Sequence, residues 1–131
     1  SAYTKKMLAY LATHDEWLGA SNSYTLITVQ DPLPPRARAA VGADVANGFY
    51  AEEADKVTAP VLKFLKRHGI EAKVIQKVGA PGELIAKAAD SGKFDLLMMG
   101  SHGHNALGSL VMGSVTTKVL AHCKVPVLLV R

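Results

Sequence analysis

The sequence predicts an α/β fold, a doubly wound parallel sheet with helices on both faces. Three observations predict it. Segments with helical and strand-like apolar spacing alternate along the chain, as in parallel strands joined by right-handed helical crossovers. The run from Phe94 to Met99 is almost continuously apolar, which is typical of a strand buried on both faces. The length of 131 residues, without an internal repeat, predicts a single domain over residues 1–131.

The first half of the chain predicts two helices, one strand and a loop. Apolar residues at helical spacing indicate a helix over 4–14, and β-branched residues indicate a strand over 24–30. The stretch 32–47 is rich in Pro, Arg, Ala and Gly, which favours a surface loop. A helix is expected over 49–68, with a kink or a break where Pro60 removes a backbone hydrogen bond.

The second half continues the alternation and ends on a strand. Turn residues with Pro and Gly separate the segments, and Pro126 belongs at the start or edge of the last strand. The expected elements are a strand over 72–78, a helix over 82–91, a strand over 94–99, a loop over 100–112, a helix over 114–122 and a strand over 125–130.

Composition excludes several classes of protein. Hydrophobic residues make up 49% of the chain and charged residues 20%, which argues against intrinsic disorder. The apolar runs are too short to span a bilayer, and no secretory leader pattern is present, so we expect no membrane association and a cytoplasmic location. Cys123 is the only cysteine, which rules out an intrachain disulfide and a multi-cysteine metal site.

The net charge of +4 is a mild basic bias. The chain has fifteen basic and eleven acidic residues, and the lysines are scattered along it rather than interleaved with aromatic residues. A base-stacking platform is therefore not indicated, and we expect no nucleic-acid partner. A modest positive field instead suits a small anionic ligand.

A glycine-containing loop between a strand and a helix is the most informative stretch. Gly100, Gly103 and Gly113 lie between the buried strand and the helix that begins at Ser114. Glycine allows a ligand to approach the backbone closely, and a helix N-terminus offers unpaired amides and partial positive charge to a phosphate. From the residues alone this pattern is weak, because glycines after a strand are often only turn residues and a serine at a helix start is usually only a cap.

This segment resembles the universal stress protein family. The nucleotide-binding members carry Gly-x2-Gly-x9-Gly-Ser/Thr, and Gly100, Gly103, Gly113 and Ser114 match it with the full spacing. The stretches 78–81, 94–101 and 122–130 are also similar to the family's segments, in the same order. The likeness extends from Ser1 to Arg131.

The resemblance implies a fold, a ligand and a set of contacts. The fold would be adenine nucleotide alpha hydrolase-like, with five parallel strands in the order 3-2-1-4-5, in a homodimer. The ligand would be ATP or AMP, with Mg²⁺ possible beside ATP. The carried-over contacts are Gly100 and Gly103 to ribose and the first phosphate, Gly113, Ser114, Val115 and Thr116 to the later phosphates, Met99 and His102 lining the pocket, and Val29 touching adenine.

The chain departs from the family at its start. The family opens with an apolar strand ending in Asp-Gly-Ser or similar, and Ser1 resembles the residue after that Asp-Gly. The missing strand is central in the order 3-2-1-4-5, so a gap is expected between 24–30 and 94–99, with two rows of unpaired backbone groups. We favour an N-terminal segment that precedes Ser1. The alternatives are a sheet that closes up and a strand supplied by another chain.

Three functions from different classes fit these observations. The first is an adenine-nucleotide-binding stress-response module that signals through dimer or partner contacts. The second is a slow ATPase or a self-phosphorylating switch that uses Ser114 or Thr116, although the sequence shows no convincing general base or arginine cluster. The third is a ligand-free protein that dimerises through the edge strand 126–130. His102 and His104 lack a third nearby ligand, so no metal site is expected.

Overall fold

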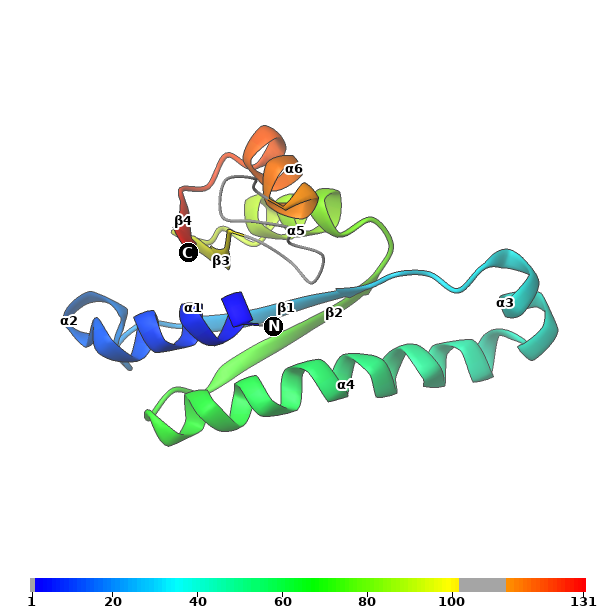
Figure 1. Ribbon diagram of the computed structural model, residues 1–131, viewed down its shortest axis with the longest axis horizontal. Coiled ribbons are helices and arrows are strands. Elements are labelled where there is room, and N and C mark those ends of the chain that lie inside the picture. The colour runs from blue at the N-terminus through cyan, green and yellow to red at the C-terminus, as the bar shows by residue number, and fades with distance from the viewer. Residues whose placement is uncertain (1, 102–112) are drawn as a thin grey trace. The chain divides into compact units, whose positions relative to one another are not determined.

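The fold consists of alternating helices and parallel strands, which confirms the α/β class (Figure 1). A computed structural model describes residues 2–101 and 113–131. In chain order its elements are α1 (Ala2–Thr13), α2 (Asp15–Leu18), β1 (Tyr24–Gln30), α3 (Pro35–Val41), α4 (Ala43–Arg67), β2 (Ala72–Val78), α5 (Pro81–Ser91), β3 (Leu97–Gly100), α6 (Ser114–His122) and β4 (Val127–Val130).

The described strands form two parallel pairs, one in each of two compact units. Unit 2 is Ser23–Pro81 and holds β1 and β2, paired from Tyr24 opposite Ala72 to Gln30 opposite Val78. Unit 1 combines Ser1–Asn22 with Gly82–Arg131 and holds β3 and β4, paired from Leu97 opposite Val127 to Gly100 opposite Val130.

These pairings confirm the expected strand order in part. In the order 3-2-1-4-5 the first strand is central, and its removal leaves one pair made of the second and third strands and another made of the fourth and fifth. The pairs β1–β2 and β3–β4 are those two. Among residues 2–101 and 113–131, these are the two strand pairs found.

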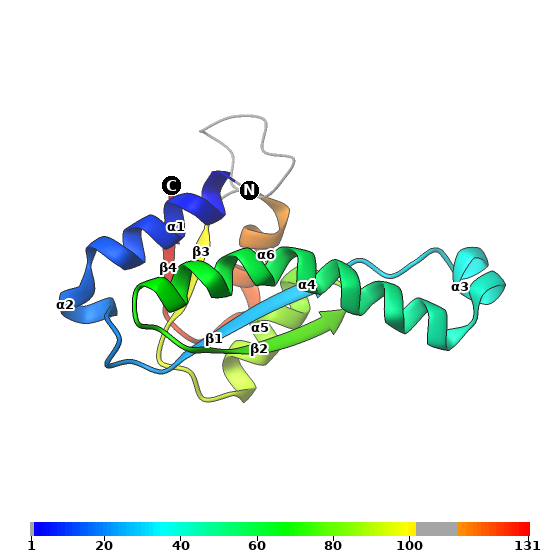
Figure 2. The same cartoon turned by 90° about the horizontal axis from the view of Figure 1, so that it is seen from below.

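In unit 2 the long helix α4 packs along β1 and β2 (Figures 1 and 2). Residues at helical spacing form its buried face, which is Ala46, Tyr50, Ala54, Thr58, Val61 and Leu65. Two side-chain contacts fix the helix: the Leu33 N–H donates to the Tyr50 hydroxyl at 2.8 Å, and Gln76 Nε2 donates to Asp55 Oδ1 at 3.1 Å. The second contact shows that Gln76 points toward α4.

The expectation of a surface loop over 32–47 is wrong. Residues 35–41 form α3, and α4 already begins at Ala43. Pro35 takes the first helical position, where its missing N–H costs nothing, and the alanines and arginines after it are good helix formers. The proline-rich composition therefore marks a helix start, and Gly42, with φ of +85°, separates the two helices.

The sequence predicts a kink or a break at Pro60, and the structure has no break there: α4 runs without interruption from Ala43 to Arg67. Proline removes one hydrogen bond to the carbonyl of Lys56, while Thr58 and Val61 on either side are buried. Thr58 also donates from Oγ1 to the Ala54 carbonyl at 3.0 Å. Packing of the buried face therefore outweighs the local cost of one proline.

In unit 1, α1 packs on β3 and β4 (Figure 2) through its buried Leu8 and Leu11. The short helix α2 was missed by sequence reasoning. Elsewhere in the unit, Asp90 of α5 fixes the entry to β4, because its Oδ1 accepts the N–H groups of Lys124 at 2.9 Å and Val125 at 3.2 Å.

Replacement of Pro60 tests whether packing carries the helix through the proline. Pro60 is exposed, so Pro60→Ala loses no buried contact and restores a backbone hydrogen bond. We expect the free energy of unfolding to rise by about 1–3 kcal/mol, measured by urea denaturation followed by circular dichroism. Pro60→Gly should gain about 1 kcal/mol less than Pro60→Ala. A Pro60→Ala protein no more stable than wild type would contradict this account.

Candidate functional site

The N-terminus of α6 is joined to the carboxyl end of β3 by two hydrogen bonds. The Gly113 N–H donates to the Ser101 carbonyl at 3.1 Å, and Thr116 donates from Oγ1 to the Gly100 carbonyl at 3.2 Å. Ser101 and Thr116 are 3% and 2% exposed, whereas Gly100 and Gly113 are half-buried, so each bond joins one buried residue to one half-buried residue. The strand end and the helix start are therefore held at a fixed separation.

The first turn of α6 presents backbone donors without a side-chain cap. Gly113 is the N-cap residue, with φ −62° and ψ 156°. Because glycine has no side chain, it makes no capping hydrogen bond to the amides of the first turn. The helical ladder begins with Thr117, whose N–H donates to the Gly113 carbonyl at 3.0 Å. The N–H groups of Ser114, Val115 and Thr116 thus have no acceptor within the helix, and they carry the positive end of its dipole.

Gly100 has a packing role that the motif alone did not reveal. A Cβ atom at this position would lie 2.9 Å from Cβ of Tyr3, a side chain of α1. A residue larger than glycine would therefore push α1 away from β3. Packing alone accounts for Gly100, whereas the φ of Gly113 is open to any residue and does not by itself require glycine.

The structure gathers most of the described site residues in unit 1. Met99 and Gly100 end β3, and Ser114 is exposed at the start of α6, with Val115 half-buried after it. Val29 lies in β1 of unit 2 and pairs with Lys77. Side chains alternate between the two faces of a sheet, and Gln76, the residue before Lys77, points toward α4. Val29 therefore lies on the face turned away from α4. The predicted contacts His102 and Gly103, and also His104, lie outside the described residues.

A small cavity in unit 2 was not predicted from the sequence. It measures about 170 Å³ and lies between α4 and the carboxyl ends of β1 and β2. Its lining includes three carboxamide side chains and two alanines, and the full set is Gln30, Asn47, Tyr50, Ala51, Ala54, Gln76, Lys77 and Val78. The residues from α4 follow helical spacing, which predicts a helix face but not a cavity, and their neighbours from β1 and β2 are distant in sequence.

Cys123 is poorly suited to act as a nucleophile. The side chain is half-buried, and its thiol lies 3.7 Å from Asp90 Oδ1. Burial raises the pKa of the Cys123 thiol, and the negative charge of Asp90 raises it further, which favours the unreactive protonated form. In the described parts of the chain, no cluster of three or more His, Cys, Asp or Glu side chains is placed to hold a metal ion.

None of the described helices is both long and apolar enough to cross a membrane.

Known proteins resemble the chain in both sequence and structure. A universal stress protein of Thermus aquaticus is 42% identical over 80 residues, which are 61% of this chain and 57% of that protein. MJ0577, a universal stress protein of Methanocaldococcus jannaschii, is 39% identical over 80 residues, which are 61% of this chain and 49% of that protein. The chain spans about half the length of these curated relatives.

Solved structures extend the likeness to nearly the whole chain. The structure of MJ0577 gives a TM-score of 0.70 at 29% identity, covering 93% of this chain and 85% of that one. The universal stress protein from Archaeoglobus fulgidus in complex with dAMP gives a TM-score of 0.69 at 16% identity, covering 100% and 90%. The sequence profile described as "Universal stress protein family" matches residues 1–131. The chain belongs to the universal stress protein family.

Proposed function

We propose that this chain is a stress-response binding module of the cytoplasm that holds an adenine nucleotide, AMP or ATP, with the phosphates at the N-terminus of α6. One observation carries the proposal: the glycine-capped start of α6 is tied to the carboxyl end of β3. In open α/β sheets, ligands bind beyond the carboxyl ends of the strands.

The first turn of α6 has the chemistry that a phosphate needs. Three successive N–H groups, from Ser114 to Thr116, can donate to phosphate oxygens, and the helix dipole favours the negative charge. The glycine cap places no side-chain oxygen in competition with the ligand. The exposed hydroxyl of Ser114 adds a further donor.

Family membership supports adenine as the base of the ligand. The A. fulgidus relative was solved in complex with dAMP, a nucleotide with one phosphate. The full spacing of Gly100, Gly103, Gly113 and Ser114 supports the same class of ligand. We assign Gly100 and Gly103 to the ribose and first phosphate and residues 113–116 to the later phosphates. Met99 and His102 line the pocket, and Mg²⁺ accompanies the ligand when it is ATP.

We further propose a homodimer formed through the strand 126–130. The Leu97 N–H donates to the Pro126 carbonyl and the Ser101 N–H to the Val130 carbonyl. Since backbone groups alternate sides along a strand, Pro126 and Val130 turn theirs toward β3, and Val127 turns its N–H toward the outer edge. That edge supplies backbone groups for pairing with the same strand of a second copy.

Two substitutions at Ser114 separate its amide from its hydroxyl. Ser114→Pro removes both donors but suits the helix, because proline is favoured at the first helical position and Gly113 already has the extended conformation that precedes proline. One charge-assisted hydrogen bond contributes about 1.5–3 kcal/mol. We therefore expect the Kd for AMP, measured by titration calorimetry, to rise about 10- to 100-fold.

Ser114→Ala is the matched control, since it removes the hydroxyl and keeps the amide. We expect a smaller loss of affinity than for Ser114→Pro, with the unfolding midpoints of both variants close to wild type. A folded Ser114→Pro protein that binds AMP as tightly as wild type would contradict phosphate binding at this helix.

A proline on the outer edge of β4 tests the proposed dimer. Val127→Pro removes the outward N–H at the first position of the strand, where proline is tolerated. We expect a lower molar mass than wild type in light scattering after size exclusion. Val127→Thr keeps both the N–H and the branched shape and should keep the wild-type mass. An unchanged mass for Val127→Pro would rule out dimerisation through this edge.

A further inference from the structure

The cavity of unit 2 reaches from the surface into the core between α4 and the strands β1 and β2. Tyr50 and Ala54 are 8% and 1% exposed, so they form its inner wall. Asn47, Ala51 and Gln76 are exposed and line it nearer the surface. Its volume of about 170 Å³ is below the roughly 300–1,000 Å³ of pockets for drug-sized ligands, so it suits a small molecule with a single ring.

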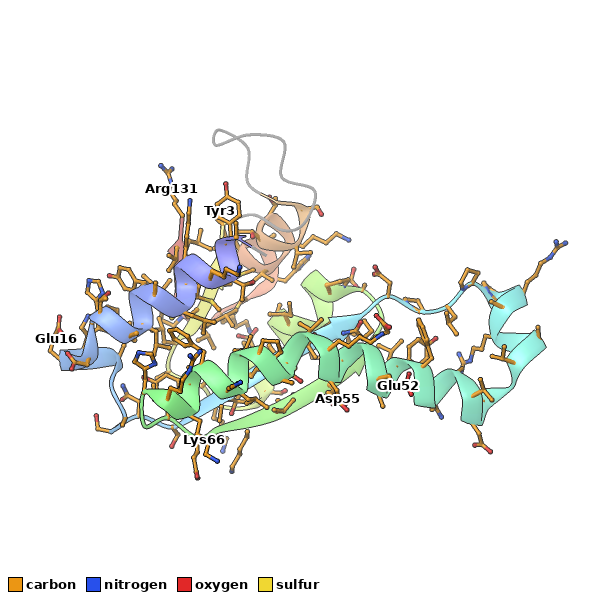
Figure 3. The ribbon with its side chains drawn as sticks, turned by 60° about the horizontal axis from the view of Figure 1, so that its bottom comes forward. Tyr3, Glu16, Glu52, Asp55, Lys66 and Arg131 are labelled. Atoms are coloured by element: carbon orange, nitrogen blue, oxygen red, sulfur yellow. The ribbon has the colours of Figure 1, made fainter. Side chains whose placement is uncertain are left out.

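Two glutamines turn toward α4 from a sheet face that ordinarily presents apolar side chains to its helix. Gln76 Nε2 donates at 3.1 Å to Oδ1 of Asp55, which Figure 3 labels on α4. Thr28 pairs with Gln76 in the register of the strands, and Gln30 Nε2 donates to Thr28 Oγ1 at 3.3 Å. Gln30, two residues after Thr28, therefore lies on the same face. Apolar packing against α4 does not account for these two carboxamides.

The carboxamides of the lining keep hydrogen-bonding groups for a ligand. Gln30 and Gln76 each use one N–H in the bonds above, and among the described hydrogen bonds their Oε1 atoms accept none. The side chain of Asn47 takes part in none of the described hydrogen bonds. A carboxamide presents a donor and an acceptor side by side, which match the C=O and N–H of an amide.

The lining carries no charge that would attract an ion. The residues described along it include no carboxylate, and Lys77 is its basic residue. Because side chains alternate along a strand and Gln76 points toward α4, the side chain of Lys77 points to the opposite face and its backbone borders the cavity. An ion that left water for this cavity would lose its hydration without meeting an opposite charge. The cavity therefore favours a neutral ligand.

We propose that this cavity binds a small, planar, uncharged molecule with an amide edge, such as a pyrimidine base or an aromatic carboxamide. The three carboxamides of the lining pair with its C=O and N–H groups, and the phenol ring and alanines of α4 pack against its ring. The site lies within unit 2 and does not involve α6, so it does not rest on the proposed nucleotide site.

Nicotinamide and nicotinate are a matched pair of probes, because they share one ring and differ in an amide against a carboxylate. At neutral pH we expect nicotinamide to bind with a Kd of about 1 mM or lower in an NMR titration of the ¹⁵N-labelled protein. Nicotinate should bind at least about tenfold more weakly, because its charge is not compensated. The side-chain NH₂ signals of Gln30, Asn47 and Gln76 should shift with nicotinamide, because these groups become its hydrogen-bond partners.

Ala51→Leu fills the cavity from its exposed side. Leucine is a good helix former, so α4 should remain intact. We expect the Kd for nicotinamide to rise at least about tenfold, because the ring can no longer enter. Ala59→Leu is the matched control, since Ala59 is exposed on the same helix and does not line the cavity. The Kd of that variant should equal the wild-type value.

Asn47→Leu tests the hydrogen bonds without filling the cavity. The two side chains are similar in volume, and the described chain uses the Asn47 side chain in no hydrogen bond, so the unfolding temperature should not fall. The Kd for nicotinamide should rise about 2- to 10-fold, the effect of losing one neutral hydrogen bond.

Three results would overturn the proposal. One is a Kd for nicotinamide above about 10 mM. Another is a nicotinate Kd equal to that of nicotinamide. The third is binding of nicotinamide at the wild-type Kd by folded Ala51→Leu and Asn47→Leu proteins. The nucleotide site is tested separately, because Ser114→Pro should weaken AMP binding and leave the Kd for nicotinamide unchanged.

Discussion

The bond from Thr116 to Gly100 and the bond from Gly113 to Ser101 are the constraint on which the site depends. They fix the start of α6 at the carboxyl end of β3. Without them, the amides of Ser114 to Thr116 would be donors at the end of a loose helix. Because Ser101 also donates to Val130, the same point is tied to β4. The donors are therefore held in place by the fold itself, which would lower the entropic cost of the proposed phosphate binding.

Much of the fold could be predicted from local patterns. The strands at 24–30 and 72–78 and the helix at 114–122 have the bounds that periodicity and capping residues indicate. The errors arose where composition and structure disagree. Pro35 is predicted as part of a loop although it starts a helix. Pro60 is predicted to kink or break the helix, but α4 is unbroken because burial of the neighbouring residues holds it together. Tertiary packing decides both cases, and no short window of sequence contains it.

The candidate site was also predictable only in part, because local spacing is visible in the sequence and tertiary packing is not. Glycines and a serine at the family's spacing marked the loop and the start of α6, but the contact of Gly100 with Tyr3 joins residues that are distant in sequence. The strand pairs β1–β2 and β3–β4 preserve the neighbours expected in the family order. The neighbours expected in the universal stress protein order thus persist in each pair, and the hydrogen bond from Thr116 to Gly100 keeps the proposed phosphate-binding residues of α6 beside β3 within unit 1.

Amide NMR spectra during a titration with AMP, and separately with adenosine, would test phosphate recognition by α6 most directly. The account predicts that AMP shifts the amide signals of Ser114, Val115 and Thr116 strongly, since their N–H groups become donors to the phosphate. Adenosine lacks that phosphate and should shift them much less. Equal shifts of these three signals with AMP and adenosine, or no shifts with AMP while other signals saturate, would contradict the account.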